Sequence, residues 1–345
     1  MTTGIRFRFR TWRCTRTSMP FAFLAALSLA AAAPAAPADD PAATFAALRE
    51  VDGRMAAIAY RLTTANAALC RDRQPTPGWA LHAIGQYDAP LRAQAKVSFG
   101  FERPVAVEAV VPGSPAAAAG IVPGDSLVAL DGRDLPDAPL PAQASSAARD
   151  AVQDLIAGLP ADRPLAVTLM HDGRTRRVTL PASPGCRSAF EVLLGPKMEA
   201  SSDGRIVQVG VRFFARYSDE ELAVVIGHEL AHTILRHRAR LDAAGVSRGL
   251  LAEVGRNGRL FRTTEDQADL LGMYLIRNAG WDPRAAVRFW RDHGGDVDGG
   301  LFRSRTHPSS KARAAALEAE IAKIPPDAPM PYLPPILAEA DKPLQ

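Results

Sequence analysis

The chain has 345 residues, of which 47% are hydrophobic and 23% charged, and its formal net charge is +4. These proportions exclude a collagen, a coiled-coil rod and a mostly disordered chain. They also exclude a polytopic membrane protein, because only one apolar run approaches the length of a membrane span. The length suggests two or three domains. A positive net charge suits a protein that binds nucleic acid, so the position of that charge along the chain has to be found first.

The first 38 residues have the features of a secretory signal peptide. Five arginines and no acidic residue precede an apolar run that starts at Pro20, and Ala36-Pro37-Ala38 forms a small-residue cleavage site. An uncleaved N-terminal anchor is the alternative, but the weakly apolar alanines and Pro34 favour cleavage. Cleavage leaves 307 residues and changes the net charge from +4 to −1. We therefore expect no nucleic-acid partner and an exported, periplasmic protein that is soluble or membrane-associated.

Two cysteines remain after the signal peptide. Cys14 lies within it, whereas Cys70 and Cys186 bracket a block of different composition. In an oxidising compartment such a pair is a candidate disulfide, and closing a loop of this size stabilises a fold by up to about 4–5 kcal/mol in the chain-entropy model. The alternative is two buried free thiols.

The residue composition and hydrophobic periodicity of the chain change several times after the signal peptide. Residues 43–70 have apolar positions at three- and four-residue steps, which predicts a helix, and the Pro- and Gly-rich stretch 71–93 predicts a loop. Short β-type runs follow, and then mostly helical periodicity after one pair of strands. We divide the chain into a signal peptide (1–38), an N-terminal helical segment that belongs with the last domain (39–93), a small β-rich domain (94–183), a mainly helical domain (184–325) and an extended Pro-rich tail (326–345).

The β-rich block resembles a PDZ domain of the bacterial protease type. We expect its first strand at Val97–Phe101, and the motifs that carry the resemblance are Pro112-Gly113-Ser114-Pro115-Ala116, Ala119-Gly120-Ile121-Val122-Pro123-Gly124-Asp125 and Leu130-Asp131-Gly132. The resemblance implies that Phe99-Gly100-Phe101 is a carboxylate-binding loop, whose backbone N–H groups would receive the C-terminus of a peptide. Alternatively, Phe99 and Phe101 are core residues of a small β domain.

The sequence His228-Glu229-Leu230-Ala231-His232 is the motif that indicates a catalytic site most clearly. It lies in a periodic segment from Ser218 to about Arg238 that opens with a capping box, which predicts a helix. Residues four apart lie on the same helical face, so His228 and His232 can bind one Zn²⁺. Glu229 would then act as general base on a zinc-activated water. The alternative is a pair of histidines with a structural role in the core.

The third ligand would come from further along the chain. The spacing of a metzincin fails, because Leu235 and Arg238 occupy the positions where that class has glycine and histidine; His237 is one residue short and lies on a different face. We expect a later helix to begin at Thr263-Thr264. Glu265 and Asp269 share one face of it, which suits one ligand and one acceptor that orients a ligating histidine. The alternatives are a solvated acidic first turn and a competing ligand at Glu253.

The final 140 or so residues resemble the HtpX-type and CAAX-prenyl-endopeptidase-type gluzincins, especially their soluble periplasmic members. The matching features are Asp219-Glu220-Glu221-Leu222-Ala223, His228 to His232 with Arg236-His237, Glu265 with Asp269, Gly272, Ala279-Gly280-Trp281-Asp282-Pro283, and Thr306-His307-Pro308 with Arg313. The resemblance implies one zinc per chain with ligands His228, His232 and Glu265, the general base Glu229, and Asp269 as a supporting acceptor. It also implies that a substrate pairs with a sheet edge at the strand Ile206–Val211.

His307 occupies the position of a third histidine in that family. It would donate a hydrogen bond to the oxyanion of the tetrahedral intermediate or cap the zinc in a resting state; alternatively it is only a turn residue before a helix. Arg313 lies six residues on, and it would either reach the same site or lie at the surface.

Together these features predict an α+β protein with a mainly helical gluzincin-type metallopeptidase domain and a small β-rich PDZ domain. We expect an exported zinc endopeptidase that acts on protein or peptide substrates, with the PDZ domain presenting free C-termini, in an envelope quality-control role by analogy. A peripheral association with a membrane or an envelope complex is compatible with this prediction, and the oligomeric state is left open. The alternative is a PDZ-based adaptor or holdase whose zinc site is structural or autoinhibited.

Overall fold

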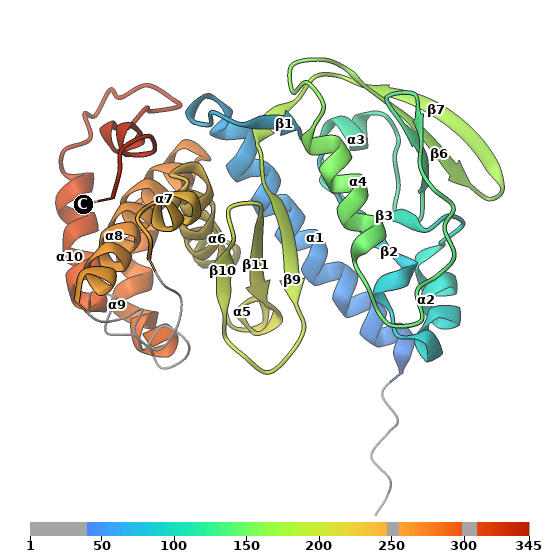
Figure 1. The fold of residues 1–345 in the computed structure, drawn as a ribbon, viewed down its shortest axis with the longest axis horizontal. Helices are drawn as coiled ribbons and strands as arrows, with labels where there is room; N and C mark the ends of the chain where they lie inside the picture. Colours follow the sequence, from blue (N-terminus) through green and yellow to red (C-terminus); the bar gives the residue numbers. More distant parts are fainter. Residues whose placement is uncertain (1–39, 247–254, 299–308, 345) are drawn as a thin grey trace, which may run out of the picture. The chain divides into compact units, whose positions relative to one another are not determined.

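The computed structural model describes residues 40–246, 255–298 and 309–344 (Figure 1). Within them helices are combined with three β-sheets, so the predicted α+β class is confirmed. The expected signal peptide lies outside the described residues. Among the helices that are described, none has the length and apolar character needed to cross a bilayer.

One large hydrophobic core joins the first helix of the described chain to the helices of its last part. Met55, Ile58 and Leu62 of α1 are buried in the same cluster as Leu230, Leu275 and other apolar residues downstream. The helix predicted over 43–70 is therefore confirmed, with slightly different bounds. The helices that contribute to this core are α1 (Pro41–Ala65), α5 (Val211–Arg216), α6 (Asp219–Ile234), α8 (Gly255–Asn278), α9 (Arg284–Asp298) and α10 (Ser310–Ile321).

Helices α6 and α8 cross at a pair of glycines. A Cβ atom on Gly272 would lie 3.0 Å from the backbone nitrogen of His228, and one on Gly227 would lie 3.3 Å from the carbonyl oxygen of Gly272. These contacts involve backbone atoms that cannot give way, so only glycine permits the approach. The crossing brings the carboxylates of α8 against the histidines of α6. The capping box predicted at Ser218 and Glu221 is present and starts α6.

A six-stranded sheet forms the β-rich part of the chain, and it begins earlier than the sequence predicts. Its strands run in the order β2-β3-β4-β6-β7, and β5 pairs with β4. The loop predicted over 71–93 is wrong there, because β2 forms within it and pairs antiparallel with β3; the short apolar run between turn-forming residues gave too weak a signal. The strands are β2 (Trp79–Ala83), β3 (Val105–Val110), β4 (Ser126–Leu130), β5 (Arg133–Asp134), β6 (Leu165–His171) and β7 (Arg174–Leu180).

The strand expected at Val97–Phe101 is also wrong. Those residues end helix α2 (Arg92–Phe99), and Gly100 adopts the left-handed conformation that terminates it. The backbone N–H groups of Gly100 and Phe101 both bond to the carbonyl oxygen of Lys96, so they are not available to a peptide carboxylate. The rings of Phe99 and Phe101 are buried in an aromatic cluster with Phe45, His82 and Tyr87. Phe99-Gly100-Phe101 is therefore a helix end with core side chains, and the carboxylate-loop assignment is corrected.

A three-stranded sheet lies beside α6, and its edge differs from the one expected. The order is β10-β11-β9, with β11 paired on both sides, so the predicted strand over Ile206–Val211 is the centre of the sheet. The edge strand that contacts α6 is β10. The bounds are β9 (Ala189–Leu193), β10 (Ala200–Ser202) and β11 (Ile206–Gly210).

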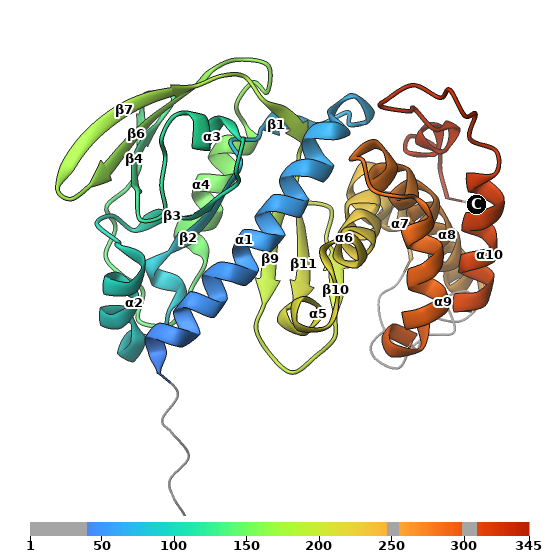
Figure 2. The same cartoon turned by 180° about the vertical axis from the view of Figure 1, so that it is seen from behind.

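Helix α1 connects the two regions of the chain, the β-rich region with the six-stranded sheet and the mainly helical region. It contacts β3 of the first and β9 and α6 of the second (Figure 2). Near its C-terminal end Cys70 and Cys186 form the predicted disulfide, with Cα atoms 5.3 Å apart. The short strands β1 (Arg73–Pro75) and β8 (Pro184–Cys186) pair antiparallel at the same place. The chain segments that enter and leave the β-rich region are thus fixed to each other by a covalent bond and a β-ladder.

The Pro-rich tail is not simply extended. Tyr332, Ile336 and Leu337 pack against the large core, and residues Pro335–Glu339 form a 3₁₀ turn, η4. The carbonyl oxygen of Lys342 accepts a hydrogen bond from Arg240. The tail is thereby attached to the helical region near α7 (His237–Ala243).

Candidate active site

Three side chains from α6 and α8 bring ligand atoms to one point. The Nε2 atoms of His228 and His232 are 3.1 Å apart, and they lie 3.2 and 3.5 Å from the two carboxylate oxygens of Glu265. Donors placed tetrahedrally around a zinc ion at its usual bond lengths are separated by about 3.3–3.5 Å. Among the residues described, these three form the one cluster that could hold a metal ion.

A carboxylate and an arginine fix the orientation of His228. Its Nδ1 atom lies 3.0 Å from Oδ1 of Asp269, and Arg313 contacts both carboxylate oxygens of Asp269. Arg313 is buried and its guanidinium stacks on the ring of Trp290 at 3.3 Å, so the surface alternative for Arg313 is wrong. Burial opposes ionisation of Asp269, but the charges and hydrogen bonds of Arg313 and His228 together outweigh that effect and lower the pKa of Asp269. Asp269 is therefore an anion that accepts a hydrogen bond from the Nδ1–H group of His228.

A different set of partners surrounds His232. Its Nδ1 atom lies 2.9 Å from Nδ1 of His237, whose Nε2 lies 3.1 Å from Oε1 of Gln267. Arg240 donates to that same amide oxygen at 3.0 Å. His237 is 1% exposed. The sequence did not reveal this contact, because a helix continuing to Arg238 would turn His237 to another face.

The chain returns to the site through a break after α6. The helix ends at Ile234, and Arg236 adopts the left-handed conformation with φ 55° and ψ 35°. His237 then begins α7 and points back toward His232. A left-handed non-glycine residue directly after H-E-x-x-H is not recognisable from residue type alone, since arginine rarely adopts it.

The histidines differ in how readily they take up a proton. Burial opposes charge on His228, but hydrogen bonds and charges from Asp269 and Glu265 outweigh it and raise its pKa to about 10. Burial instead lowers the pKa of His232 to about 4 and that of His237 to about 2. At neutral pH the rings of His232 and His237 are therefore both neutral.

Glu229 lies beside the cluster and faces a small pocket. Its side chain is buried, and it lines the pocket together with His228, Ala200 of β10 and Phe289. A carboxylate there suits proton transfer during hydrolysis. The predicted His307 and the competing Glu253 lie outside the described residues. The helix that carries Glu265 already includes Gly255, so it begins before the expected Thr263.

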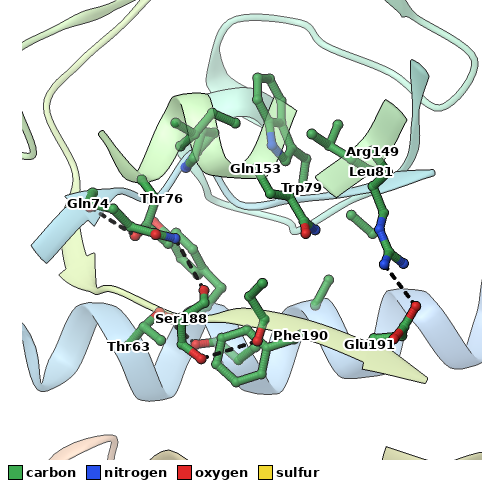
Figure 3. A pocket seen from close by; sticks show the side chains of 18 of the residues that line it. Thr63, Gln74, Thr76, Trp79, Leu81, Arg149, Gln153, Ser188, Phe190 and Glu191 are labelled. Carbon is green, nitrogen blue, oxygen red and sulfur yellow. Dashed lines mark hydrogen bonds and ion pairs between the residues drawn. The ribbon is translucent and has the colours of Figure 1, made fainter. Parts of the chain in front are cut away.

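A second hollow lies between the two regions of the chain. It is a cleft of about 540 Å³ lined by α1, β2, β9 and α4 (Ala147–Ala157). Strand β2 is the edge of its sheet, and β9 is the edge of the other. In Figure 3 the amide of Gln153 points from α4 into the cleft, and Arg149 reaches across to Glu191 of β9, 2.8 Å away. The Oε1 atom of Gln153 has no hydrogen-bond partner in the described part of the chain.

Two neighbouring carboxyl groups line this cleft, the buried one of Glu108 and the partly buried one of Asp52. Asp52 of α1 and Glu108 of β3 share a hydrogen bond, and burial raises the pKa of Asp52 to about 6 and that of Glu108 well above its ordinary value. Burial lowers the pKa of the adjacent His82 to about 3, and its Nε2 atom has no partner among residues 40–246, 255–298 and 309–344. The cleft thus contains polar groups that do not make all the hydrogen bonds available to them within the described chain.

Two parts of the chain match known protein families. Residues 106–163 match the PDZ domain, and residues 250–321 match Peptidase family M48. The second match includes Glu265, Asp269 and Arg313, whereas His228 and His232 precede it. The α6–α8 crossing unites the two sets of residues.

Two known proteins are similar to part of the chain. The mitochondrial metalloendopeptidase OMA1 of Schizosaccharomyces pombe is 31% identical over 121 residues, which cover 29% of this chain and 36% of that protein. The protein of the same name from Arabidopsis thaliana is 33% identical over 123 residues, covering 29% of this chain and 24% of that protein. The chain therefore spans about a third or less of the length of these relatives.

These matches confirm the predicted resemblance. One part of the chain is thus similar to the PDZ domain, and another part is similar to Peptidase family M48 and to two metalloendopeptidases. The family implies a zinc cofactor, and the cluster of His228, His232 and Glu265 has the donor types and separations that zinc requires. The domain boundaries and the roles of single residues stay predictions.

Proposed function

We propose that the chain is a zinc-dependent endopeptidase that binds one zinc ion through His228, His232 and Glu265. The observation that carries the proposal is the separation of 3.1–3.5 Å between their ligand atoms. A structural zinc site is usually closed by four protein ligands, whereas a catalytic site keeps one position open. Three donors beside a pocket that contains a carboxylate match the catalytic type.

The residues around the cluster have separate tasks in peptide hydrolysis. Zinc bound by the three donors would polarise a water molecule and the substrate carbonyl. Glu229 accepts the proton of the attacking water and passes it to the nitrogen of the leaving amine. Asp269, held as an anion by Arg313, keeps the Nδ1 proton of His228 in place, so Nε2 is the nitrogen that would release its proton and present a lone pair to the metal. Burial by Phe289 and Trp290 limits competing water on this side.

The edge strand β10 offers a place for the substrate backbone. It pairs with β11 on one side only, and its residue Ala200 lines the pocket of Glu229. An extended substrate that adds to the free edge of β10 would lie across the metal cluster. Endopeptidases bind extended chains in this manner because the backbone hydrogen bonds do not depend on the substrate sequence.

Casein cleavage tests the activity. Wild-type protein that contains one zinc per chain should cleave casein, and Glu229→Gln should retain zinc while its rate falls by about 10²–10⁴-fold. Glu220→Gln, in the first turn of the same helix and paired with Arg288, is the matched control and should cleave at the wild-type rate. Zinc-loaded wild-type protein that cleaves no substrate would favour the adaptor or holdase alternative.

We further propose that residues 1–38 direct export, and that the mature enzyme acts on misfolded envelope proteins. The disulfide between Cys70 and Cys186 supports an oxidising compartment. Edman sequencing of the exported protein should give Asp39 as its first residue. An N-terminus at Met1 in the membrane fraction would instead identify an uncleaved anchor.

A second candidate function is peptide binding in the cleft. Its support is the free edge of β2 next to α4, together with the incompletely bonded amide of Gln153. A peptide that pairs with β2 would gain backbone hydrogen bonds and could complete those of Gln153. Fluorescence anisotropy with labelled decapeptides should show binding that Gln153→Ala weakens. Equal affinity for amidated and free C-termini would exclude recognition of a terminal carboxylate.

A further inference from the structure

We propose that Arg240, Gln267 and His237 form a chain of hydrogen bonds that positions the metal ligand His232 and fixes its tautomer. The inference rests on the proposed zinc site, and it concerns residues that neither the H-E-x-x-H motif nor the carboxylates of α8 include. The chain of atoms runs through side chains on α7 and α8 and ends at the metal cluster.

The direction of each hydrogen bond follows from Arg240. A guanidinium only donates, so the Gln267 atom that it contacts at 3.0 Å is the amide oxygen. That oxygen only accepts, so Nε2 of His237, 3.1 Å away, must carry a hydrogen. In a neutral ring the other nitrogen then has no hydrogen, and Nδ1 of His237 is an acceptor.

The assignment continues to the metal ligand. Nδ1 of His232 lies 2.9 Å from the accepting Nδ1 of His237, so it must donate and carry the hydrogen. Nε2 of His232 is then left with a lone pair, and this is the atom that faces His228 and Glu265. The hydrogen-bond chain therefore selects the tautomer that can bind zinc through Nε2.

Arg240 is itself held firmly. Its Nε donates to the carbonyl oxygen of Lys342 and its Nη1 to that of Leu235, the residue directly after α6. The left-handed Arg236 turns the backbone so that His237 and Arg240 approach α6 again. The two zinc-binding histidines are thus supported in different ways: His228 by an anion, and His232 by a neutral imidazole.

The tautomers can be measured directly by ¹⁵N NMR of the full chain labelled at histidine. In zinc-loaded protein we expect the hydrogen of His232 on Nδ1 and that of His237 on Nε2. The opposite tautomer of His237 in protein that holds one zinc would overturn the inference. A folded wild-type protein that takes up no zinc would instead refute the proposed function, so the two failures are distinguishable.

Zinc affinity provides a second readout, by competition with a chelator. His237→Phe removes the acceptor and should raise the zinc Kd by about 10–100-fold, whereas His237→Asn, which keeps an oxygen near the Nδ1 position, should recover part of that loss. His293→Phe, on α9 and away from the cluster, is the control and should leave Kd unchanged. If His237→Phe fails to fold, Gln267→Leu gives the answer, because a mixture of His237 tautomers is then expected. A wild-type zinc Kd in folded His237→Phe would contradict the positioning role.

Discussion

The metal cluster and the cleft both bury polar side chains, yet they differ in how completely those side chains are bonded. Around the cluster, Asp269 and His237 each hold one histidine, and both acceptors are held in turn by an arginine or a glutamine. In the cleft, Gln153 and His82 each have an atom without a partner in the described ranges. Completed networks preorganise a metal site, whereas incomplete ones suit a groove that gains its partners from a ligand.

Removal of a metal ligand should produce the largest change in zinc affinity, and it would test the proposed role of the metal cluster. Glu265→Ala should raise the zinc Kd by about three orders of magnitude or more, because a catalytic site has only three protein ligands. The adjacent Asp266→Ala is a matched control, since that side chain is exposed and outside the cluster. Chelator competition measures both variants. Stoichiometric, tight zinc in Glu265→Ala would show that the third ligand is another residue.

A substitution at the glycines where α6 and α8 cross tests whether the metal cluster depends on the close approach of these two helices. Gly272→Ala places a methyl group 3.0 Å from the backbone of His228, so we expect the free energy of unfolding to fall by about 1–3 kcal/mol and zinc binding to weaken. Gly295→Ala on α9 meets no atom within 4 Å and should be neutral or slightly stabilising. Urea unfolding of the zinc-free proteins compares them. Equal stability of the two variants would contradict the packing argument.

The carboxyl pair that lines the cleft should make stability depend on pH. The pKa of Asp52 is raised to about 6 in the folded chain, so between about pH 4 and 6 the folded state binds more protons than the unfolded state. Stability contributed by this group is therefore lost as pH rises through that window. Asp52→Asn should be more stable than wild type at pH 7.5, by an amount on the order of 1–3 kcal/mol, and should lose that advantage at pH 4.

Urea midpoints at the two pH values measure this difference. Asp327→Asn, at an exposed position of the tail, serves as the control and should show no such dependence. A constant difference between Asp52→Asn and wild type at both pH values would mean that the carboxyl pair does not titrate in this range.

Gln267 beside the metal cluster and Gln153 in the cleft allow the two regions to be compared with the same substitution. Gln267→Leu leaves the N–H groups of His237 and Arg240 without their acceptor and should cost about 1–3 kcal/mol of stability. Gln153→Leu removes an amide oxygen that has no partner within the described chain, and should change stability by less than about 0.5 kcal/mol. Thermal unfolding of both variants provides the measurement. A larger loss for Gln153→Leu would reverse the contrast between the two regions.

The motif and its helical spacing were sufficient to predict much of the cluster. Two histidines four residues apart must share a face, and Glu265 and Asp269 share one for the same reason, so the periodicity of a helix carries the information. The contact of His237 with His232 could not be predicted in this way. It depends on the left-handed Arg236, and arginine gives no local signal for that conformation.

In the β-rich region the sequence predicts the fold correctly but places a strand wrongly. The motif from Pro112 to Asp125 identifies the fold, but the first strand that the sequence predicts, at Val97–Phe101, is wrong, because the first strand of the sheet is Trp79–Ala83. Alternation over five residues is too short to distinguish a strand from a helix end. Which of two segments pairs with β3 is decided by tertiary packing, since the aromatic rings of Phe99 and Phe101 fill a core with Phe45 of α1.

X-ray absorption at the zinc edge tests the central claim most directly. Purified wild-type protein with one zinc per chain should give a spectrum with at least two imidazole nitrogens at about 2.0–2.1 Å and a carboxylate oxygen at about 2.0–2.2 Å. Glu265→Ala should lose that carboxylate or its zinc. A folded chain that takes up no zinc, or a spectrum with fewer than two imidazoles, would contradict the assignment of His228, His232 and Glu265 as a catalytic metal site.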